Sequence, residues 1–326
     1  MNYICFDLEG PLSPQDNAYE LMSLFPRGGQ VFEVISRYDD LLALEGREDY
    51  EPGDTLALII PFLVCHGISE SDITGLAEKA SLVEGARELI TGLKGWKVFC
   101  ISTSYEQYAR RIVQRAGIPF SNLACTHFPL ERYARLAKKD DLARVEDMER
   151  EILAMSPEDD EGIKSRLDRF FWTELPGTSL GPALEEVKAM GGQRKVAALR
   201  GFASDNNSTL RDWLAVGDSI TDYKMLQEVH QAGGLAIAFN ANEYALPYAT
   251  MGLASTNLGD LGIVMDAWEK GGKAAVEALI REKERAGGKG DRGNFHWLSG
   301  REDTEKVPSI HKRIRGIVRR QAAKLG

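Results

Sequence analysis

The sequence predicts an α/β fold built on a parallel β-sheet. Short, almost continuously apolar runs alternate along the chain with longer segments whose apolar residues recur at helical spacing. Strands that are apolar on both faces are typical of a parallel sheet covered by helices on both sides. Five runs of this kind are expected to form strands: residues 3–7, 97–102, 123–128, 213–218 and 234–240.

Two long insertions interrupt this alternation. The first carries helix-spaced apolar residues, and the segment 84–93 after it is expected to cover the sheet and lead to the second strand. The second insertion begins with alternating charges over residues 138–169, which are typical of a solvated helix pair. Three aromatic residues at 170–172 follow this pair, and they either pack in a core or form a wall that faces a substrate.

These patterns divide the chain into four expected units. They are a sheet core over residues 1–13, 84–128 and 190–265, a helical insertion over 14–83, a second helical insertion over 129–189, and a C-terminal helix with a basic tail over 266–326. In an open α/β sheet, ligands bind beyond the carboxyl ends of the strands. The ends of the five expected strands are therefore the place where a site is expected.

The composition argues against nucleic acid or a membrane as the main partner. The formal net charge is −9, and an acidic chain is a poor match for a polyanion. No apolar run approaches the roughly 20 residues that span a bilayer, and the N-terminus enters a strand without the pattern of an export signal. The cysteines form no CxxC pair, and Cys5 and Cys100 lie in expected strands, as small core residues do in a reducing compartment. We therefore expect a cytoplasmic protein.

The last part of the chain differs in charge from the rest. Residues 301–326 contain eight Lys or Arg and three Asp or Glu, a net charge of +5. One interpretation is a basic terminal helix that rests on the acidic body of the protein, or a tail without structure. The other is a segment that docks on an acidic surface or another anionic partner.

Two carboxylates stand at the end of the first expected strand. Asp7 and Glu9 are two residues apart, so the period of a strand places them on the same side, and Gly10 follows at once. Two acids this close repel each other, and the pair favours a bound cation or a shared proton. A plainer interpretation is a pair of loop-end acids without a task.

Other polar residues occur at comparable places. Ser102 ends the second expected strand, Asp218 ends the fourth, and Asp222 lies one helical turn later. Lys195 opens a helical pattern after two glycines. The plainer alternatives are a helix cap for Ser102, an Asx turn with a helix cap for the two aspartates, and a surface position for Lys195. Because Asp7, Ser102 and Asp218 share the carboxyl edge of one sheet, we expect them to meet.

In this order of motifs the chain resembles the haloacid dehalogenase-like (HAD) superfamily, in its phosphatase branch. The order is strand–DxEG, strand–Ser/Thr, a Lys, and strand–GDSxxD. The resemblance covers the core, roughly residues 1–12, 84–128 and 190–260, and not the insertions or the tail. It implies a Rossmann-like parallel sheet with a HAD-like core, and the first insertion looks like the helical cap domain that roofs the active site in many members.

The resemblance implies a phosphoric monoester hydrolase that depends on Mg²⁺ and acts on a small phosphorylated metabolite. Asp7 would be the nucleophile that forms an aspartyl-phosphate, and Glu9 the general acid and base. The metal ligands would be Asp7, Asp218, the backbone carbonyl of Glu9 and Asp222, the last directly or through water.

The phosphoryl group would be bound by the hydroxyl of Ser102, the backbone N–H of Thr103 and the ammonium group of Lys195. Lys195 would also orient the nucleophile, although Lys188 and Arg194 lie near it in the sequence and compete for this role.

The chain departs from the common pattern at two places. Glu9 replaces a second Asp, as in some phosphoserine-phosphatase-like and enolase-phosphatase-like relatives, and Pro11 replaces a frequent Thr. Dehalogenases lack an acid at position 9, so Glu9 argues against carbon–halogen cleavage. The alternative functions are a phosphotransferase or mutase with the same intermediate, and a non-catalytic binding or regulatory protein, which a cap that occludes the site would favour.

Overall fold

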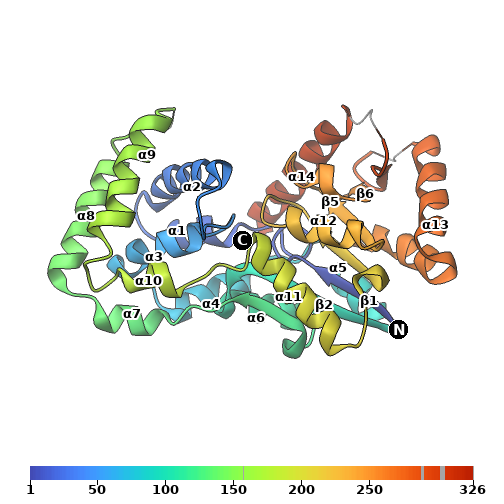
Figure 1. The fold of residues 1–326 in the computed structure, drawn as a ribbon, viewed down its shortest axis with the longest axis horizontal. Helices are drawn as coiled ribbons and strands as arrows, with labels where there is room; N and C mark the ends of the chain where they lie inside the picture. Colours follow the sequence, from blue (N-terminus) through green and yellow to red (C-terminus); the bar gives the residue numbers. More distant parts are fainter. Residues whose placement is uncertain (157, 288–289, 302–304, 326) are drawn as a thin grey trace.

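The core of the protein is a mixed β-sheet, whose strands lie in the right-hand lobe of Figure 1. The computed structural model describes residues 1–156, 158–287, 290–301 and 305–325. Within these residues the sheet has seven strands in the order β3-β2-β1-β4-β5-β6-β7, all parallel except β7. The strands are β1 (Asn2–Phe6), β2 (Trp96–Tyr105), β3 (Leu123–Thr126), β4 (Trp213–Gly217), β5 (Leu235–Phe239), β6 (Met251–Ala254) and β7 (Asn294–Trp297).

The five strands predicted from the sequence are confirmed as β1 to β5, and two more complete the sheet. β6 and β7, each four residues long, were not expected from the sequence. β2 continues beyond its predicted end at Ser102 to Tyr105, and its register with β3 shifts between these two residues. The segment that carries the expected phosphate-binding residues is therefore an irregular strand end rather than a loop.

The position of β1 explains where the site lies. β1 pairs with β2 on one side and with β4 on the other, so that Phe6 lies between Cys100 and Val216. After β1 the chain forms β2 and β3 on one side of it, and then returns to form β4 on the other side. This reversal of strand order marks the switch point at which α/β sheets bind ligands. The carboxyl ends of β1 and β4 are adjacent, and the N–H of Asp7 donates to the carbonyl of Val216 at 2.8 Å.

Helices cover both faces of the sheet, as the apolar strands predict. Ile4 and Phe6 pack in one apolar cluster with residues of α5, α6 and α13, whereas Tyr3 and Cys5 pack on the opposite face with α11 and α12. Cys5 and Cys100 are free, buried thiols. The bounds of these helices are α5 (Ala86–Gly92), α6 (Glu106–Ala116), α11 (Gly192–Asp205), α12 (Tyr223–Gln231) and α13 (Gly262–Ala286).

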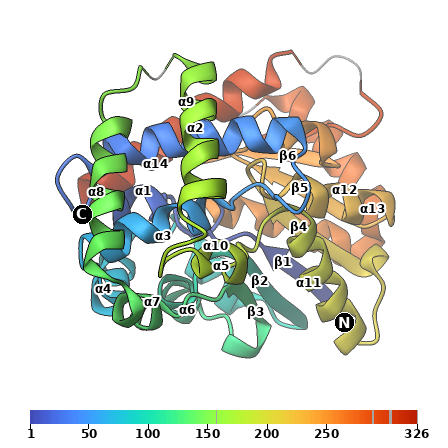
Figure 2. The ribbon, with the colours of Figure 1, turned by 60° about the vertical axis from the view of Figure 1, so that its left-hand side comes forward.

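The two insertions pack together into one helical lobe, which we call the cap (Figures 1 and 2). α2 contacts α9, and α3 contacts α8 and α10. Tyr38 of α2 donates to Asp168 of α9 at 2.6 Å. The cap comprises α1 (Asn17–Met22), α2 (Gly28–Glu45) and α3 (Thr55–Cys65) from the first insertion, and α7 (Leu130–Leu136), α8 (Lys139–Ile152), α9 (Asp160–Arg169) and α10 (Pro182–Glu186) from the second. α4 (Glu70–Lys79) packs instead against α6 of the core.

The charged segment 138–169 forms the predicted helix pair, but the pair is not simply solvated. Each helix buries an apolar stripe in the cap, with Val145 and Met148 on α8 and Leu167 on α9. The aromatic residues that follow belong to the same core, because Phe170 and Phe171 are buried. The prediction of a solvated pair relied on the charged residues of this segment and overlooked the apolar residues that recur among them at helical spacing.

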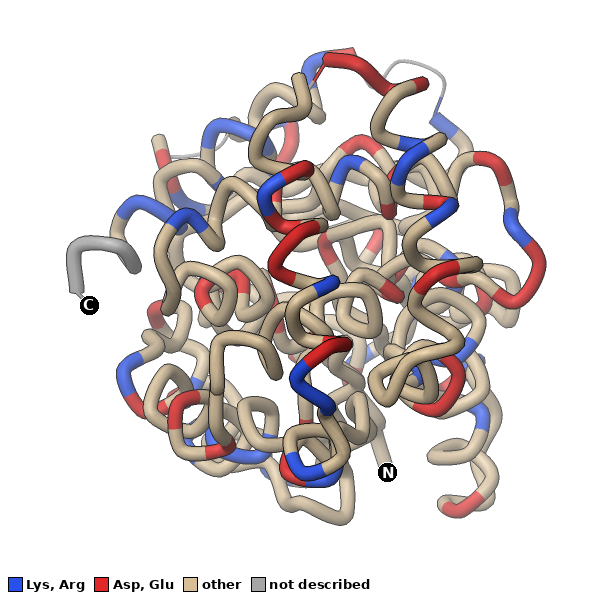
Figure 3. The backbone as a smooth tube through the Cα atoms, turned by 90° about the vertical axis from the view of Figure 1, so that its left-hand side faces the viewer, with Lys and Arg blue, Asp and Glu red and all other residues tan. Residues whose placement is uncertain are grey.

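The C-terminal basic segment forms a helix that packs on the core. α14 (Val307–Leu325) contacts β6, and the buried His311 accepts a hydrogen bond at Nδ1 from the N–H of Ala241 at 3.0 Å. Lys and Arg positions recur along this segment toward the C-terminus (Figure 3). The expectation of a basic helix that rests on the body is confirmed for the described part of the segment. Positions 288–289, 302–304 and 326 of the expected C-terminal unit lie outside the described residues.

The most apolar helix, α3, is a core element of the cap. All of its residues except Cys65 are buried. Of the helices that the structure describes, none alone is long and apolar enough to span a membrane, and only α3 and α4 together meet that test, across a bend of 116°.

Candidate active site

Three buried aspartates meet at the carboxyl edge of the sheet. Asp7 directly follows β1, Asp218 directly follows β4, and Asp222 precedes α12. One carboxylate oxygen from each lies within 4.8 Å of the others. The sequence-based expectation that these acids converge agrees with this geometry.

A buried lysine joins two of these aspartates. Lys195, in the first turn of α11, is fully buried and donates from Nζ to Oδ1 of Asp7 at 2.7 Å and to Oδ1 of Asp222 at 2.6 Å. Burial opposes the charged form of Lys195, but the two carboxylates outweigh it and raise the pKa of the ammonium group. The competing residues are elsewhere: Lys188 is exposed, and Arg194 pairs with Asp54. Of the three basic residues considered from the sequence, Lys195 is therefore the one that contacts the aspartates.

Asp222 organises this centre and has no free carboxylate oxygen. Its Oδ2 accepts from the N–H groups of Asp218 at 2.9 Å and Ser219 at 3.1 Å, while its Oδ1 accepts from Lys195. An oxygen that accepts two backbone donors is poorly placed to bind a cation directly. Of the two roles expected for Asp222, metal binding through water fits this geometry better than direct ligation.

The charges of the centre call for a cation. Burial, followed by the nearby carboxylate of Asp222, raises the pKa of Asp7 well above its usual range, despite Lys195. Burial also raises the pKa of Asp218, which the guanidinium of Arg315 opposes. A hard divalent cation between Asp7 and Asp218 would stabilise both ionised forms, and Mg²⁺ prefers a few carboxylates together with water and phosphate oxygens. The donor set therefore fits Mg²⁺.

The loop after β1 brings Asp7 and Asp218 together through Gly10. Gly10 has a φ of +93°, and its N–H donates to the carbonyl of Ser13 at 2.7 Å. A Cβ atom on Gly10 would lie 2.4 Å from Oδ2 of Asp218. Only glycine combines this backbone conformation with so close an approach.

Replacing Gly10 with Ala is therefore expected to displace Asp218 and lower turnover at least about 100-fold, because a small misplacement of a catalytic group can cost that much. Gly67→Ala is the matched control, since Gly67 also has positive φ (+65°) but no atom lies within 4 Å of the position that its methyl group would take. It should cost only about 1 kcal/mol of stability and leave turnover unchanged. Steady-state kinetics and urea unfolding of both variants test this, and equal activities would contradict it.

Glu9 lies beside the aspartates at the mouth of the site. Its Oε1 accepts from the N–H of Asn17 at 3.1 Å and from the hydroxyl of Ser104 at 2.7 Å. Burial, and next the charge of Asp16, raise the pKa of Glu9 to about 7. A carboxyl group with a pKa near neutrality both donates and accepts a proton readily at neutral pH. Since Asn17 begins α1, the cap itself helps to hold this side chain.

The serine and threonine residues of β2 are arranged differently from the expectation. Ser102 is fully buried, and its Oγ accepts from the N–H of Ser104 at 3.1 Å. It does not cap α6, because the residue before that helix is Tyr105. Thr103 and Ser104 line the cavity beside Asp7, whereas Ser102 does not. Sequence reasoning missed Ser104, because the irregular end of β2 turns it into the cavity while Ser102 stays out of the lining.

A cavity of about 300 Å³ lies between these residues and the cap. The core contributes Asp7, Glu9 and Thr103 to its lining, and α2 contributes Phe32 and Asp39. The cap therefore roofs the site without filling it.

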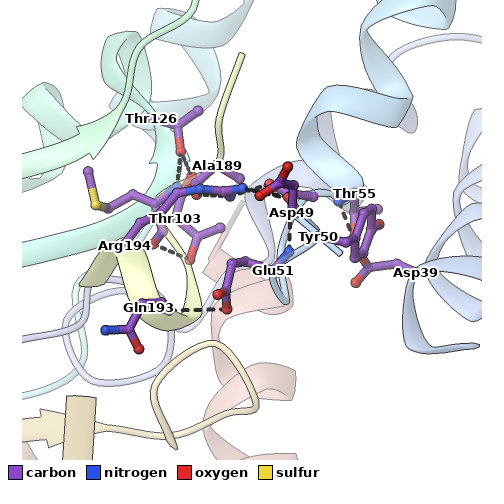
Figure 4. A network of polar contacts seen from close by, with 12 residues as sticks. Asp39, Asp49, Tyr50, Glu51, Thr55, Thr103, Thr126, Ala189, Gln193 and Arg194 are labelled. Carbon is purple, nitrogen blue, oxygen red and sulfur yellow. Dashed lines mark hydrogen bonds and ion pairs between the residues drawn. The ribbon is translucent and has the colours of Figure 1, made fainter. Parts of the chain in front are cut away.

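A polar network fastens the cap to the core next to this cavity (Figure 4). In the loop before α3, Glu51 accepts from the N–H of Gln193 at 3.1 Å, and Asp54 forms a two-pronged ion pair with Arg194 at 2.5 and 3.0 Å. A bidentate pair of this kind fixes orientation as well as distance. Arg194 thus holds the cap against α11, one residue before Lys195.

The C-terminal helix also reaches the site, which the sequence did not indicate. Nη2 of Arg315 lies 2.9 Å from Oδ2 of Asp218, and Nη1 donates to the carbonyl of Asp218 at 3.4 Å. Arg315 and Arg319 both line the cavity. The basic segment thus docks on an acidic site of its own chain, and docking on another partner finds no support.

The chain was compared with protein families, curated proteins and solved structures. A scan against protein families and a search of curated proteins find no match. Among solved structures, gene product AF1437 from Archaeoglobus fulgidus is similar over 100% of this chain and 99% of its own, with a TM-score of 0.84 and 30% identity. Two phosphoserine phosphatase structures, one with a phospho-aspartyl intermediate analogue and one with bound substrate, match 80% of this chain and 97% of theirs at 18% identity, with TM-scores of 0.52 and 0.50.

The phosphoserine phosphatase matches support the expected fold, a Rossmann-like parallel sheet with helical insertions. The likeness to the archaeal protein extends over the cap and the C-terminal helix as well as the core, because the whole chain is covered. The chain belongs to the same family as gene product AF1437 of Archaeoglobus fulgidus.

Proposed function

We propose that the protein is a Mg²⁺-dependent phosphatase that hydrolyses a small phosphomonoester through an aspartyl-phosphate on Asp7. The observation that carries this proposal is the convergence of Asp7, Asp218 and Asp222 around Lys195 at the switch point of the sheet, open to a roofed cavity. Phosphoryl transfer needs an in-line nucleophile and groups that neutralise the phosphoryl oxygens, and this arrangement supplies both.

In the first half-reaction Asp7 attacks phosphorus. Lys195 holds Oδ1 of Asp7, which leaves Oδ2 to form the new O–P bond while the P–O bond to the leaving group breaks. Glu9, protonated at neutral pH in part because burial raises its pKa to about 7, gives its proton to the departing alkoxide. Bound Mg²⁺ would be held by Asp7 and Asp218 and would neutralise charge on the phosphoryl oxygens.

In the second half-reaction Glu9, now ionised, takes a proton from a water molecule whose oxygen attacks phosphorus. The bond between phosphorus and Oδ2 of Asp7 breaks, which releases inorganic phosphate and restores the carboxylate. Ser104 orients Glu9 through its 2.7 Å hydrogen bond. Thr103 lines the cavity and would donate to the phosphoryl group through its backbone N–H, while the hydroxyl of Ser104 donates its hydrogen bond to Glu9.

The cavity supports catalysis over a purely regulatory role. A cap that occluded the nucleophile would favour a binding protein without turnover, but here about 300 Å³ remains beside Asp7 and Glu9. This volume is at the lower limit of typical small-molecule pockets and favours a small substrate.

Screening of phosphorylated metabolites with Mg²⁺ and with EDTA tests the proposal. We expect release of inorganic phosphate from at least one phosphomonoester with Mg²⁺ and none with EDTA. Mg²⁺ should also raise the melting temperature of the wild type, because a ligand of the folded state stabilises it, and this shift should be lost in Asp218→Asn. Turnover in EDTA would contradict the metal assignment, and transfer of phosphate to an added alcohol in place of water would favour the phosphotransferase alternative.

A further inference from the structure

Helix α14 places two arginines in the cavity beside the nucleophile. Arg315 and Arg319 are four residues apart and therefore lie on one face of the helix. Of the described residues that line the cavity, these two are the only basic ones, and the other ionisable residues there are carboxylates. Like charges at this spacing disfavour a helix by themselves, so their shared orientation toward the cavity points to a role in the site.

The two arginines have different partners. Arg315 is committed to Asp218 through its contacts to the carboxylate and the backbone carbonyl, and its side chain is only 20% exposed. It is a positioning residue for Asp218. Arg319 is exposed, and within the described part of the chain it forms no hydrogen bond and no ion pair. Its guanidinium is therefore accessible to a ligand.

Arg319 stands where two cavities meet. It lines the cavity beside Asp7 and also a second cavity of about 660 Å³, whose lining includes Tyr19 and Phe32 but none of the aspartates around Lys195. A substrate whose phosphoryl group lies at Asp7 would extend past Arg319 to reach this second space.

We propose that Arg319 binds a second anionic group of the substrate, so that the substrate is a phosphomonoester that also carries a carboxylate or another phosphate. The inference rests on the proposed function, because it takes the scissile phosphoryl group to lie at Asp7. A guanidinium offers a planar fork of donors that matches both carboxylate and phosphate. In this proposal Arg315 positions Asp218, whereas Arg319 binds the substrate.

The acidic residues of the second cavity define the competing outcome. Asp16, Glu20, Glu33 and Asp40 line it, and a substrate with an ammonium group would suit them. Asp16 is partly occupied, because its Oδ1 caps α1 by accepting from the N–H of Tyr19 at 3.1 Å. A test must therefore compare anionic, neutral and cationic substrates of the same length.

The experiment uses four phosphomonoesters with a two-carbon remainder: phosphoglycolate, ethane-1,2-diol bisphosphate, 2-hydroxyethyl phosphate and 2-aminoethyl phosphate, together with the corresponding four-carbon set. Values of kcat and KM are measured with Mg²⁺ for the wild type, Arg319→Gln, Arg319→Lys and Arg320→Gln. Arg320, the next residue on α14, is exposed and lines neither cavity, which makes it the matched control.

We expect the wild type to prefer a carboxylate or bisphosphate substrate over the hydroxyethyl or hydroxybutyl analogue by about 10- to 100-fold in kcat/KM, the worth of one charge-assisted contact. In Arg319→Gln this ratio should fall to near one, mainly through KM, because the contact is remote from the reacting bond. Arg319→Lys should retain part of the ratio and Arg320→Gln all of it. Which of the two anionic substrates is preferred identifies the second group.

A wild-type preference for the hydroxyl or amino substrates, or a ratio unchanged in Arg319→Gln, would overturn the inference while the phosphatase activity stood. No turnover of any member with Mg²⁺ would overturn the proposed function, and the inference with it.

Discussion

The Asp7→Asn variant is expected to lose turnover by about 10⁴-fold or more while it keeps its fold, since loss of a covalent nucleophile removes the intermediate itself. The amide oxygen can still accept from Nζ of Lys195, which lies 2.7 Å from Oδ1 in the wild type. One of three mutually repelling buried carboxylates is removed, so stability should change by no more than about 1 kcal/mol. Steady-state phosphate release and urea unfolding measure the two effects.

The control for this variant is Asp212→Asn. Asp212 is exposed and immediately precedes β4, at the opposite end of that strand from Asp218. The Asp212→Asn variant makes the same chemical change, from carboxylate to amide, at a position outside the site. Its turnover should therefore equal that of the wild type. Acid quench with a ³²P-labelled substrate should trap label on the wild-type chain and on Asp212→Asn but not on Asp7→Asn. A variant Asp7→Asn that keeps a tenth of the wild-type rate would exclude the mechanism.

The centre of this site was predictable because strand ends carry it. Asp7 and Asp218 each follow an apolar run, and a parallel sheet brings the carboxyl ends of its strands to one edge. The pairing of β1 with β4 then makes the two ends neighbours. Lys195 was predictable by type and order but not uniquely, because two other basic residues, Lys188 and Arg194, lie within the seven positions before it. Only Lys195 is fully buried among these three residues, and burial depends on the fold rather than on the local sequence.

The parts that were not predicted depend on contacts between distant segments. The two insertions look independent in the sequence, yet Arg37 of α2 pairs with Asp160 of α9 at 2.5 Å and both belong to one cap. Arg315 lies 97 residues from Asp218, and the sequence indicated a basic helix on the acidic body of the protein, or a tail without structure, but no contact with Asp218. A charge pattern records which residues are polar, but it does not record which carboxylate each will meet. β6, against which α14 packs, was not predicted either, so nothing in the sequence indicated where the C-terminal helix would lie.

The electrostatics of the site connect its stability to its chemistry. Asp7, Asp218 and Asp222 are all nearly or fully buried, and the described cations that contact them are Lys195 and Arg315. Burial of charges is costly unless opposite charges and hydrogen bonds compensate for it. Lys195 offsets the cost of burying these carboxylates, and in the proposed mechanism it also holds the oxygen of Asp7 that does not attack phosphorus. A single substitution at Lys195 should therefore affect both folding and turnover.

Replacing Lys195 with Met is accordingly expected to destabilise the protein by about 3–5 kcal/mol, the usual cost of breaking a buried ion pair and leaving its partners unpaired. Because the Met side chain fills a volume similar to that of Lys, the loss of stability measures the missing charge rather than a new cavity. Turnover should fall at least about 100-fold as well, because Asp7 loses the donor that orients it. Urea unfolding in EDTA at neutral pH measures the first effect. In Mg²⁺ the difference from the wild type should narrow, because a cation between the carboxylates replaces part of the missing charge.

Lys188→Met is the matched control for this substitution. Lys188 is exposed and lies seven residues earlier, so its change should fall within about 0.5 kcal/mol and leave turnover intact. This pair of variants also decides experimentally between two lysines that the motif alone does not distinguish. If Lys195→Met unfolded at the same urea concentration as Lys188→Met, the buried aspartates would have to be protonated in the folded protein. The cluster would then have no need of a cation, and the argument for a metal-assisted site would lose its physical basis.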